Sequence, residues 1–140
     1  MRYLLDTNIF IYAAIDRDLL SRDVKAILED YDNTFFLSSE SVKEMIVGFN
    51  NGGIVSRFWK TASEMVNAIR EQFYIRILPV GEEQMDTYAR LVLNHAENHK
   101  DPSDHVIIAH AITNNIPLIS SDSKFEFYRS QGLDLIFNQK

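Results

Sequence analysis

Short apolar runs and longer helical repeats follow one another along the chain. Runs of aliphatic, β-branched and aromatic residues predict strands at residues 2–5, 34–37, 74–78, 117–120 and 135–137. Apolar residues spaced by three and four predict helices between them. These helices are expected at residues 6–15, 21–31, 38–49, 55–73, 82–97, 101–114 and 122–128. Strands that alternate with helices indicate βαβ units, so we expect a three-layer α/β/α fold with a mainly parallel sheet of four to five strands.

Composition places the chain among ordinary globular proteins. Its 140 residues suit one compact domain, and 46% of them are hydrophobic. Cysteine is absent, which excludes disulfides and thiolate metal sites. Asp6 and Asn8 interrupt the apolar start of the chain, so we expect no secretory signal. No apolar run approaches the roughly 18 residues of a membrane span, and we expect a cytoplasmic protein.

The net charge of −6 argues against a nucleic-acid partner, because phosphate binding usually leaves a basic surface. Bound divalent cations would offset part of an acidic site, and a basic rim or a second subunit would supply phosphate contacts. Lys43, Arg57, Lys60 and Lys100 are candidates for such a rim, although scattered basic residues are more often an ordinary solvated surface.

Six acidic residues fall where predicted strands and helices meet. They are Asp6, Glu40, Glu44, Asp101, Asp104 and Asp122. Binding sites in open α/β sheets form outside the carboxyl ends of the strands, and most of these junctions share that edge. We therefore expect several of the carboxylates to lie close together.

Clustered carboxylates repel one another unless a counter-charge is present. A hard divalent cation such as Mg²⁺ supplies that charge and favours oxygen ligands and water. Such a cation promotes phosphodiester hydrolysis. The expected ligands, direct or through water, are Asp6, Glu44, Asp104 and Asp122. Asn8 and Ser120 are expected to orient a carboxylate or a water by hydrogen bonding.

Each acid also has a purely structural interpretation. Asp6 and Asp122 are suitable helix N-caps, as is Asp101, which has at most an outer role at the site. Glu44 could complete a capping box with Ser41. Asp104 could simply complement a helix dipole.

Four motifs in order resemble a known family. They are LLDTN at 4–8, Glu44 early in a helix, DPSDHVIIAHA at 101–111 and LISSDSKF at 118–125. Together they resemble PIN-domain ribonucleases, and most closely the VapC-type toxins of toxin–antitoxin pairs. The resemblance spans nearly the whole chain and implies a single PIN-like nuclease domain at residues 1–140.

The resemblance also implies chemistry and partners. It makes Asp6, Glu44, Asp104 and Asp122 the four catalytic and metal-binding acids, in that order. It implies Mg²⁺ or Mn²⁺ as cofactor, an RNA substrate such as tRNA or rRNA, a homodimer, and inhibition by a cognate antitoxin protein. Hydrolysis by an activated water predicts a 5′-phosphate and a 3′-hydroxyl as product ends.

This chain departs from the family pattern at some positions. Ser120 stands where Thr is common, which keeps the hydroxyl, and His105 stands where Arg is frequent. Glu40 lies one helical turn before Glu44, on the same face, so either residue could be the second acid.

Other features have weaker functional interpretations. His95 and His99 have a spacing that can hold Zn²⁺ on a helix, but no Glu completes the usual motif. The stripe Phe58, Trp59, Met65 and Ile69 is typical of a core-facing helix. Because that helix would be long for this chain, we hypothesise that part of the stripe joins a dimer or antitoxin interface.

Two rival functions use the same residues. One is a catalytically silent PIN-like module that binds RNA or protein. The other is an aspartyl-phosphate phosphatase, which would need a second Asp two residues after Asp6, where this chain has Asn8.

Overall fold

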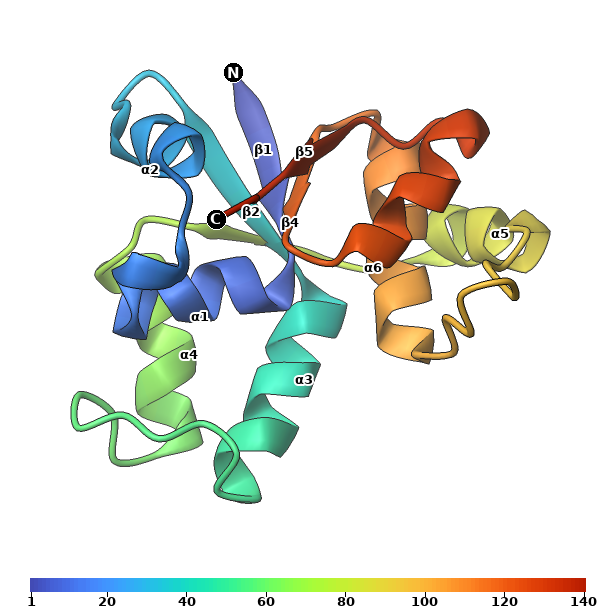
Figure 1. The fold of residues 1–140 in the computed structure, drawn as a ribbon. Helices are drawn as coiled ribbons and strands as arrows, with labels where there is room; N and C mark the ends of the chain where they lie inside the picture. The colour runs from blue at the N-terminus through green and yellow to red at the C-terminus, as the bar shows by residue number, and fades with distance from the viewer.

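The computed structural model describes residues 1–140 and contains one five-stranded sheet in the order β3-β2-β1-β4-β5. The strands are β1 (Arg2–Leu5), β2 (Thr34–Ser38), β3 (Arg76–Leu78), β4 (Leu118–Ser120) and β5 (Leu135–Phe137). Every neighbouring pair is parallel. The predicted fold class is confirmed, since helices cover both faces of this sheet (Figure 1).

Helices connect successive strands, as a parallel sheet requires. They are α1 (Thr7–Ile15), α2 (Arg22–Glu29), α3 (Ser39–Asn50), α4 (Ala62–Glu71), α5 (Glu82–Arg90) and α6 (Pro102–Asn114), with the 3₁₀ segments η1 (Arg17–Leu19) and η2 (Ser123–Gln131). None of these helices combines the length and hydrophobicity that crossing a membrane would require.

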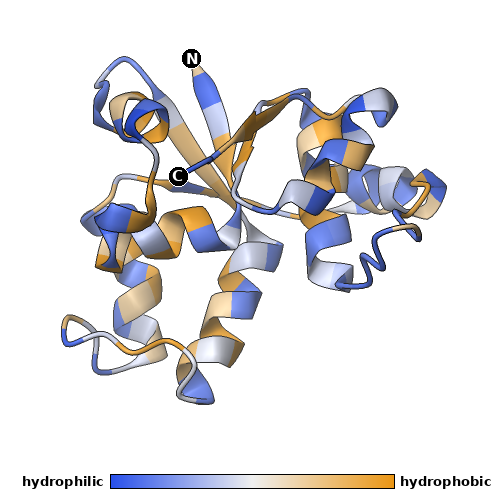
Figure 2. Ribbon diagram, viewed as in Figure 1, coloured by the Kyte–Doolittle hydropathy of each residue, from blue (hydrophilic) through white to orange (hydrophobic).

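Successive side chains of β1 point to opposite faces of the sheet, and each face has its own hydrophobic cluster. Tyr3 and Leu5 face a cluster formed with α1 to α4, whereas Leu4 faces a second cluster formed with α6 and η2. Hydrophobic residues accordingly concentrate along the strands and on the helix faces turned toward them (Figure 2). The sheet is therefore buried on both faces, which explains its near-continuous apolar strands.

The single helix predicted at residues 55–73 is wrong. The helix begins only at Ala62. Thr61 is its N-cap, since the Thr61 hydroxyl accepts a hydrogen bond from Glu64 N at 3.1 Å. Trp59 lies before this cap but is 6% exposed, so it packs into the core from a loop. The helical spacing of apolar residues at 55–73 thus comes from two segments with different backbone conformations, a loop before Thr61 and the helix α4 after it.

The helix predicted at residues 82–97 is too long. It ends at Arg90, and the side chain of Gln131 then binds the backbone of Val92 through both its oxygen and its nitrogen. His95 and His99 consequently lie in a loop, the first exposed and the second buried. Their four-residue spacing does not place them on one helical face, which removes the basis for the zinc site.

Candidate metal centre

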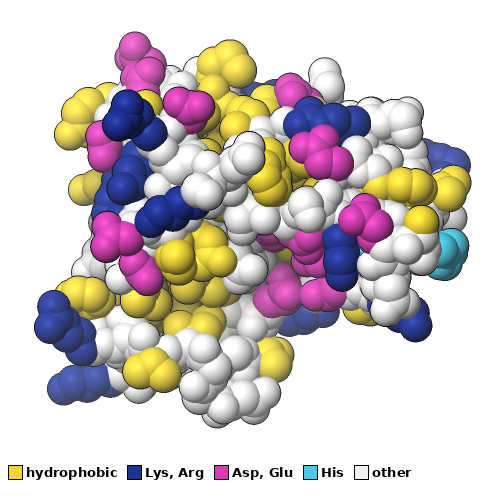
Figure 3. All heavy atoms as spheres, viewed as in Figure 1, with side chains coloured by type: hydrophobic (Ala, Val, Ile, Leu, Met, Phe, Trp, Pro, Cys, Tyr) yellow, Lys and Arg dark blue, Asp and Glu magenta, His cyan; other side chains and the backbone are white.

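The acidic residues converge at the carboxyl edge of the sheet. Asp6 follows β1 directly and Asp122 follows β4, while α3 and α6 begin at the same edge because helices run antiparallel to the strands they connect. The centre lies at the carboxyl ends of β1 and β4. These neighbouring strands form the topological switch point of the sheet, because β2 and β3 lie on one side of them and β5 on the other. Acidic side chains gather in the recess between the α1–α3 part and the α6–η2 part of the molecule (Figure 3).

Asp6 is the most buried of these acids, at 5% exposed. Its Oδ1 accepts a hydrogen bond from Thr7 N at 2.8 Å, and its Oδ2 accepts one from the Ser120 hydroxyl at 2.8 Å. It therefore caps α1 and faces the acidic recess at the same time. Asn8, in contrast, is exposed and its side chain makes no hydrogen bond in this structure.

Asp104 lies at the centre of the arrangement. Single ligand atoms from Asp104, Asp122 and His99 all lie within 4.8 Å of one another, and the same holds for Asp104, Asp101 and Glu44. The two groups share Asp104, so the structure brings two of the other predicted acids, Glu44 and Asp122, to within 4.8 Å of it. Asp6 faces Asp104 closely enough for repulsion between them to raise its pKa.

In three of the acids, a hydrogen bond fixes one carboxylate oxygen and the other oxygen has no partner. Glu44 Oε1 accepts from the Thr7 hydroxyl at 2.7 Å, Asp104 Oδ2 is 3.0 Å from His99 Nε2, and Asp122 Oδ1 accepts from Lys124 N at 2.9 Å. A fixed carboxylate with a free oxygen is suited to binding a cation without a large rearrangement.

The electrostatics of the cluster are unfavourable without a cation. Burial, followed by repulsion from Asp104, raises the pKa of Asp6 from 3.8 to about 7. Burial, followed by repulsion from Asp101 and Glu44, raises the pKa of Asp104 to about 7. Burial also raises the pKa of Glu44. The N-termini of α1 and α6 offset only part of this repulsion.

Glu40 and Glu44 have different surroundings although both lie on α3. Glu40 Oε2 contacts Lys43 Nζ at 2.6 Å and accepts from the Ser103 hydroxyl at 3.0 Å. Glu44 points to Thr7 and belongs to the acidic group. The capping box of Glu44 with Ser41 is not formed, because Ser38 caps α3 and the Ser41 hydroxyl is buried without a partner.

The structural roles of the other acids coexist with the cluster. Asp101 is exposed and caps α6 by accepting from Ser103 N at 3.0 Å, and Asp122 caps η2. An N-cap uses one carboxylate oxygen, so capping does not prevent the other from facing a ligand.

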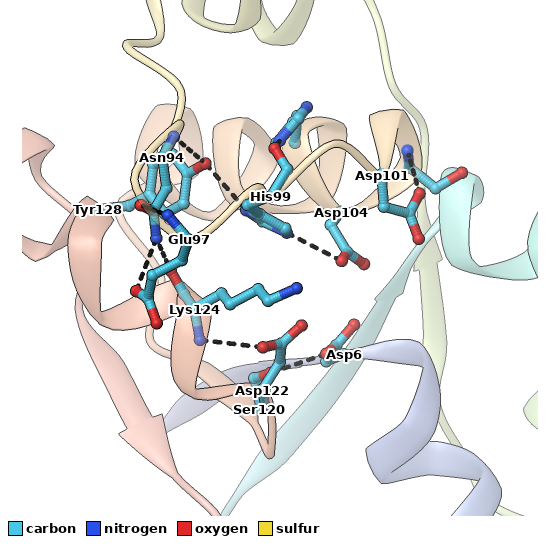
Figure 4. A network of polar contacts seen from close by, with 12 residues as sticks. Asp6, Asn94, Glu97, His99, Asp101, Asp104, Ser120, Asp122, Lys124 and Tyr128 are labelled. Carbon is cyan, nitrogen blue, oxygen red and sulfur yellow. Dashed lines mark hydrogen bonds and ion pairs between the residues drawn. The ribbon is translucent and has the colours of Figure 1, made fainter.

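Sequence reasoning considered His99 only as a zinc ligand with His95, and it missed Lys124 and Tyr128 beside the acids. His99 bridges Asp104 and the Tyr128 hydroxyl, and Lys124 extends toward the gap between Asp104 and Asp122 (Figure 4). Lys124 stands two residues after Asp122, a proximity that could have identified it, whereas no local signal connects His99 to Tyr128. His105 is buried, and its Nε2 donates to the His99 carbonyl at 3.0 Å rather than facing the recess.

The donor set fits a hard divalent cation. Several carboxylate oxygens converge, and two of the acids have pKa values near 7 without a cation. Lys124 extends between Asp104 and Asp122 but forms no ion pair with either. Mg²⁺ and Mn²⁺ favour such oxygen ligands, and their charge would relieve the repulsion.

A three-layer fold with acids at the carboxyl edge of a parallel sheet defines a class of α/β proteins with an acidic centre. A family model described as PIN domain matches residues 3–130, and this chain belongs to the PIN-domain family. The resemblance inferred from the four motifs is thereby confirmed.

Solved structures support the same fold. The chain is similar to VapBC2 from Rickettsia felis bound to a promoter DNA fragment, with 22% identity, a TM-score of 0.72, and coverage of 99% of this chain and 100% of that one. VapBC-1 from nontypeable Haemophilus influenzae has 24% identity, a TM-score of 0.70 and full coverage of both chains (100% each). FitAcB from Neisseria gonorrhoeae has 21% identity, a TM-score of 0.66, and coverage of 97% and 96%. No curated protein sequence matches this chain significantly.

Proposed function

We propose that this chain is a metal-dependent endoribonuclease that hydrolyses RNA phosphodiester bonds, and that it is the toxin of a type II toxin–antitoxin system. The observation that carries this proposal is the convergence of acids from separate segments on Asp104, with two pKa values raised to about 7. Membership of the PIN-domain family supports a nuclease. Residues 1–140 would then be a single nuclease domain.

The proposed metal ligands are Asp6, Glu44, Asp104 and Asp122, for Mg²⁺ or Mn²⁺. When bound, such a cation would lower the pKa of an attacking water and neutralise charge on the phosphoryl group. The protein's own contribution is to hold the carboxylates: Ser120 and Thr7 N fix Asp6, and the Thr7 hydroxyl fixes Glu44. Attack by water needs no ribose 2′-oxygen, so the expected products carry a 5′-phosphate and a 3′-hydroxyl.

The direct test is cleavage of structured RNAs, such as tRNA and rRNA fragments, with Mn²⁺, Mg²⁺ or EDTA. We expect cleavage that requires metal and is lost in Asp6→Asn and Asp104→Asn. Asp86→Asn, which changes an exposed acid on α5, is the matched control and should cleave normally. Products ending in a 2′,3′-cyclic phosphate would contradict the mechanism. RNA binding without cleavage under any metal would instead identify a silent binding module.

A matched pair of variants on α3 tests the choice of the second acid. Glu44→Gln removes a carboxylate that belongs to the acidic group and contacts Thr7, whereas Glu40→Gln removes one that pairs with Lys43. We expect Glu44→Gln to weaken Mn²⁺ binding and cleavage by at least about tenfold, and Glu40→Gln to change them little. The opposite order would assign the role to Glu40.

A protein partner is part of the proposal, because the similar structures include toxin–antitoxin complexes. Of the predicted stripe, Trp59, Met65 and Ile69 are buried and Phe58 is 61% exposed, so only Phe58 is available for an antitoxin or a second copy. Co-expression with any short open reading frame beside the gene tests the antitoxin. Light scattering at tens of micromolar tests the homodimer, and a strict monomer would contradict it. A cytoplasmic location stays a prediction.

A further inference from the structure

A buried chain of hydrogen bonds ties Asp104 to the backbone of a distant loop. Asn94 N donates to the Tyr128 hydroxyl at 3.0 Å, that hydroxyl lies 2.9 Å from His99 Nδ1, and His99 Nε2 lies 3.0 Å from Asp104 Oδ2 (Figure 4). Tyr128 is fully buried and His99 is 3% exposed. Asn94, Tyr128 and His99 thus form one line that ends on Asp104, and Tyr128 joins it from 29 residues beyond His99.

The hydroxyl of Tyr128 determines where the proton of His99 lies. This hydroxyl accepts from Asn94 N and has no other partner except His99 Nδ1. If Nδ1 carried a hydrogen, the Tyr128 O–H would be buried without an acceptor, which is unfavourable. Nδ1 is therefore the acceptor and Nε2–H is the donor to Asp104.

The loop that carries His99 is itself fixed. Asn94 Nδ2 donates to the Lys124 carbonyl at 3.2 Å, and His99 N donates to the Asn94 carbonyl at 3.0 Å. His105 Nε2 donates to the His99 carbonyl, and the His99 ring packs against Phe125 with centroids 5.5 Å apart. The imidazole therefore has little freedom to leave Asp104.

We propose that His99 is a positioning residue that donates Nε2–H to Asp104 Oδ2, and so presents the other oxygen of Asp104 to the bound cation. The proposal rests on the proposed function, since it concerns the same metal centre. The same hydrogen placement leaves Nε2 without a free lone pair, so His99 does not act as a nitrogen ligand to the cation. Its role is transmitted through Asp104 alone.

The first test reads the hydrogen placement directly and does not depend on metal-supported activity. The chain has four histidines, so long-range ¹H–¹⁵N correlation spectra can be assigned by single substitutions. We expect the non-protonated nitrogen of His99 to be Nδ1, in EDTA and with Mg²⁺. A ring whose Nε2 carries no hydrogen would overturn the proposal.

The second test measures Mn²⁺ affinity by electron paramagnetic resonance of the free ion. His99→Phe keeps a ring but removes the donor, and we expect about 10- to 100-fold weaker binding. His99→Gln supplies a donor again and should recover part of this loss. His95→Phe, in the same loop but exposed, is the matched control and should bind as the wild type does.

The outcomes separate this proposal from the proposed function. Wild-type protein that binds no Mn²⁺, or an Asp6→Asn variant that binds it equally well, contradicts the metal centre itself. Normal binding in His99→Phe contradicts only the positioning role. If His99→Phe does not fold by near-ultraviolet circular dichroism, His99→Leu replaces it, because it also removes the Nε2–H donor to Asp104. Unchanged Mn²⁺ affinity in that folded variant would likewise overturn the proposal.

Discussion

Asp6→Asn should stabilise the metal-free protein at alkaline pH. In the folded state the pKa of Asp6 is about 7, raised from 3.8 by burial and then by repulsion from Asp104. The folded protein therefore keeps a proton that the unfolded chain releases near pH 4. Between about pH 4 and pH 7 the folded state binds more protons, so its stability falls as the pH rises. Above pH 7 the penalty of the buried charge is fully present.

The magnitude follows from the size of the shift. About three pKa units correspond to roughly 4 kcal/mol, and coupling to Asp104 reduces what a single substitution recovers to about 2–4 kcal/mol. Asn keeps the hydrogen bond from Thr7 N, because its oxygen can still accept it. Its amide would donate to the Ser120 hydroxyl, which donates to Asp6 in the wild type, so the buried Ser120 O–H loses its acceptor and this loss offsets part of the gain. For a chain of this length, about 3 °C per kcal/mol converts the gain to a rise in Tm of roughly 6–12 °C.

The assay is thermal or urea unfolding in EDTA at pH 5 and pH 8. We expect Asp6→Asn to exceed the wild type in stability at pH 8 and to lose most of that advantage at pH 5, where Asp6 is already protonated. Added Mn²⁺ should stabilise the wild type and reverse the order. Asp86→Asn, on the exposed face of α5, should show no such pH dependence. A variant less stable than the wild type at pH 8 in EDTA would refute the reasoning.

Further predictions concern the cation, the basic neighbour and the core. Mn²⁺ at about 100 times its Kd should stabilise the wild type by about 2.7 kcal/mol, measured by urea unfolding, and should barely affect Asp104→Asn. Lys124 lowers the pKa of Asp104, so Lys124→Met should cost up to about 1 kcal/mol at pH 8 in EDTA and less at pH 5. Phe10→Ala should cost about 3–5 kcal/mol at either pH, because Phe10 is fully buried and packs edge-on against Phe73.

Local sequence determined the strands and all the helix starts except that of α4, together with the edge of the sheet where the acids meet. Apolar runs are sufficient for buried parallel strands, and Ser21, Asp101 and Asp122 cap the elements that follow them through hydrogen bonds over two or three residues. Asp6 and Asp122 could be assigned to one edge because all parallel strands end there. These features depend on neighbours along the chain, so one sequence is enough to read them.

Tertiary contacts decided the features that sequence alone assigned wrongly or missed. Trp59 follows a helical spacing yet reaches the core from a loop, because spacing records burial and not backbone conformation. The Gln131 side chain holds the backbone of Val92, just after the end of α5, although the two residues are 39 positions apart. The Tyr128 hydroxyl holds the ring of His99 from 29 positions away. Such bonds form only once the sheet and helices have packed. Their partners are far apart along the chain, so no local pattern of residues encodes them, and in the buried Tyr128–His99 pair the bond offsets the cost of removing polar groups from water.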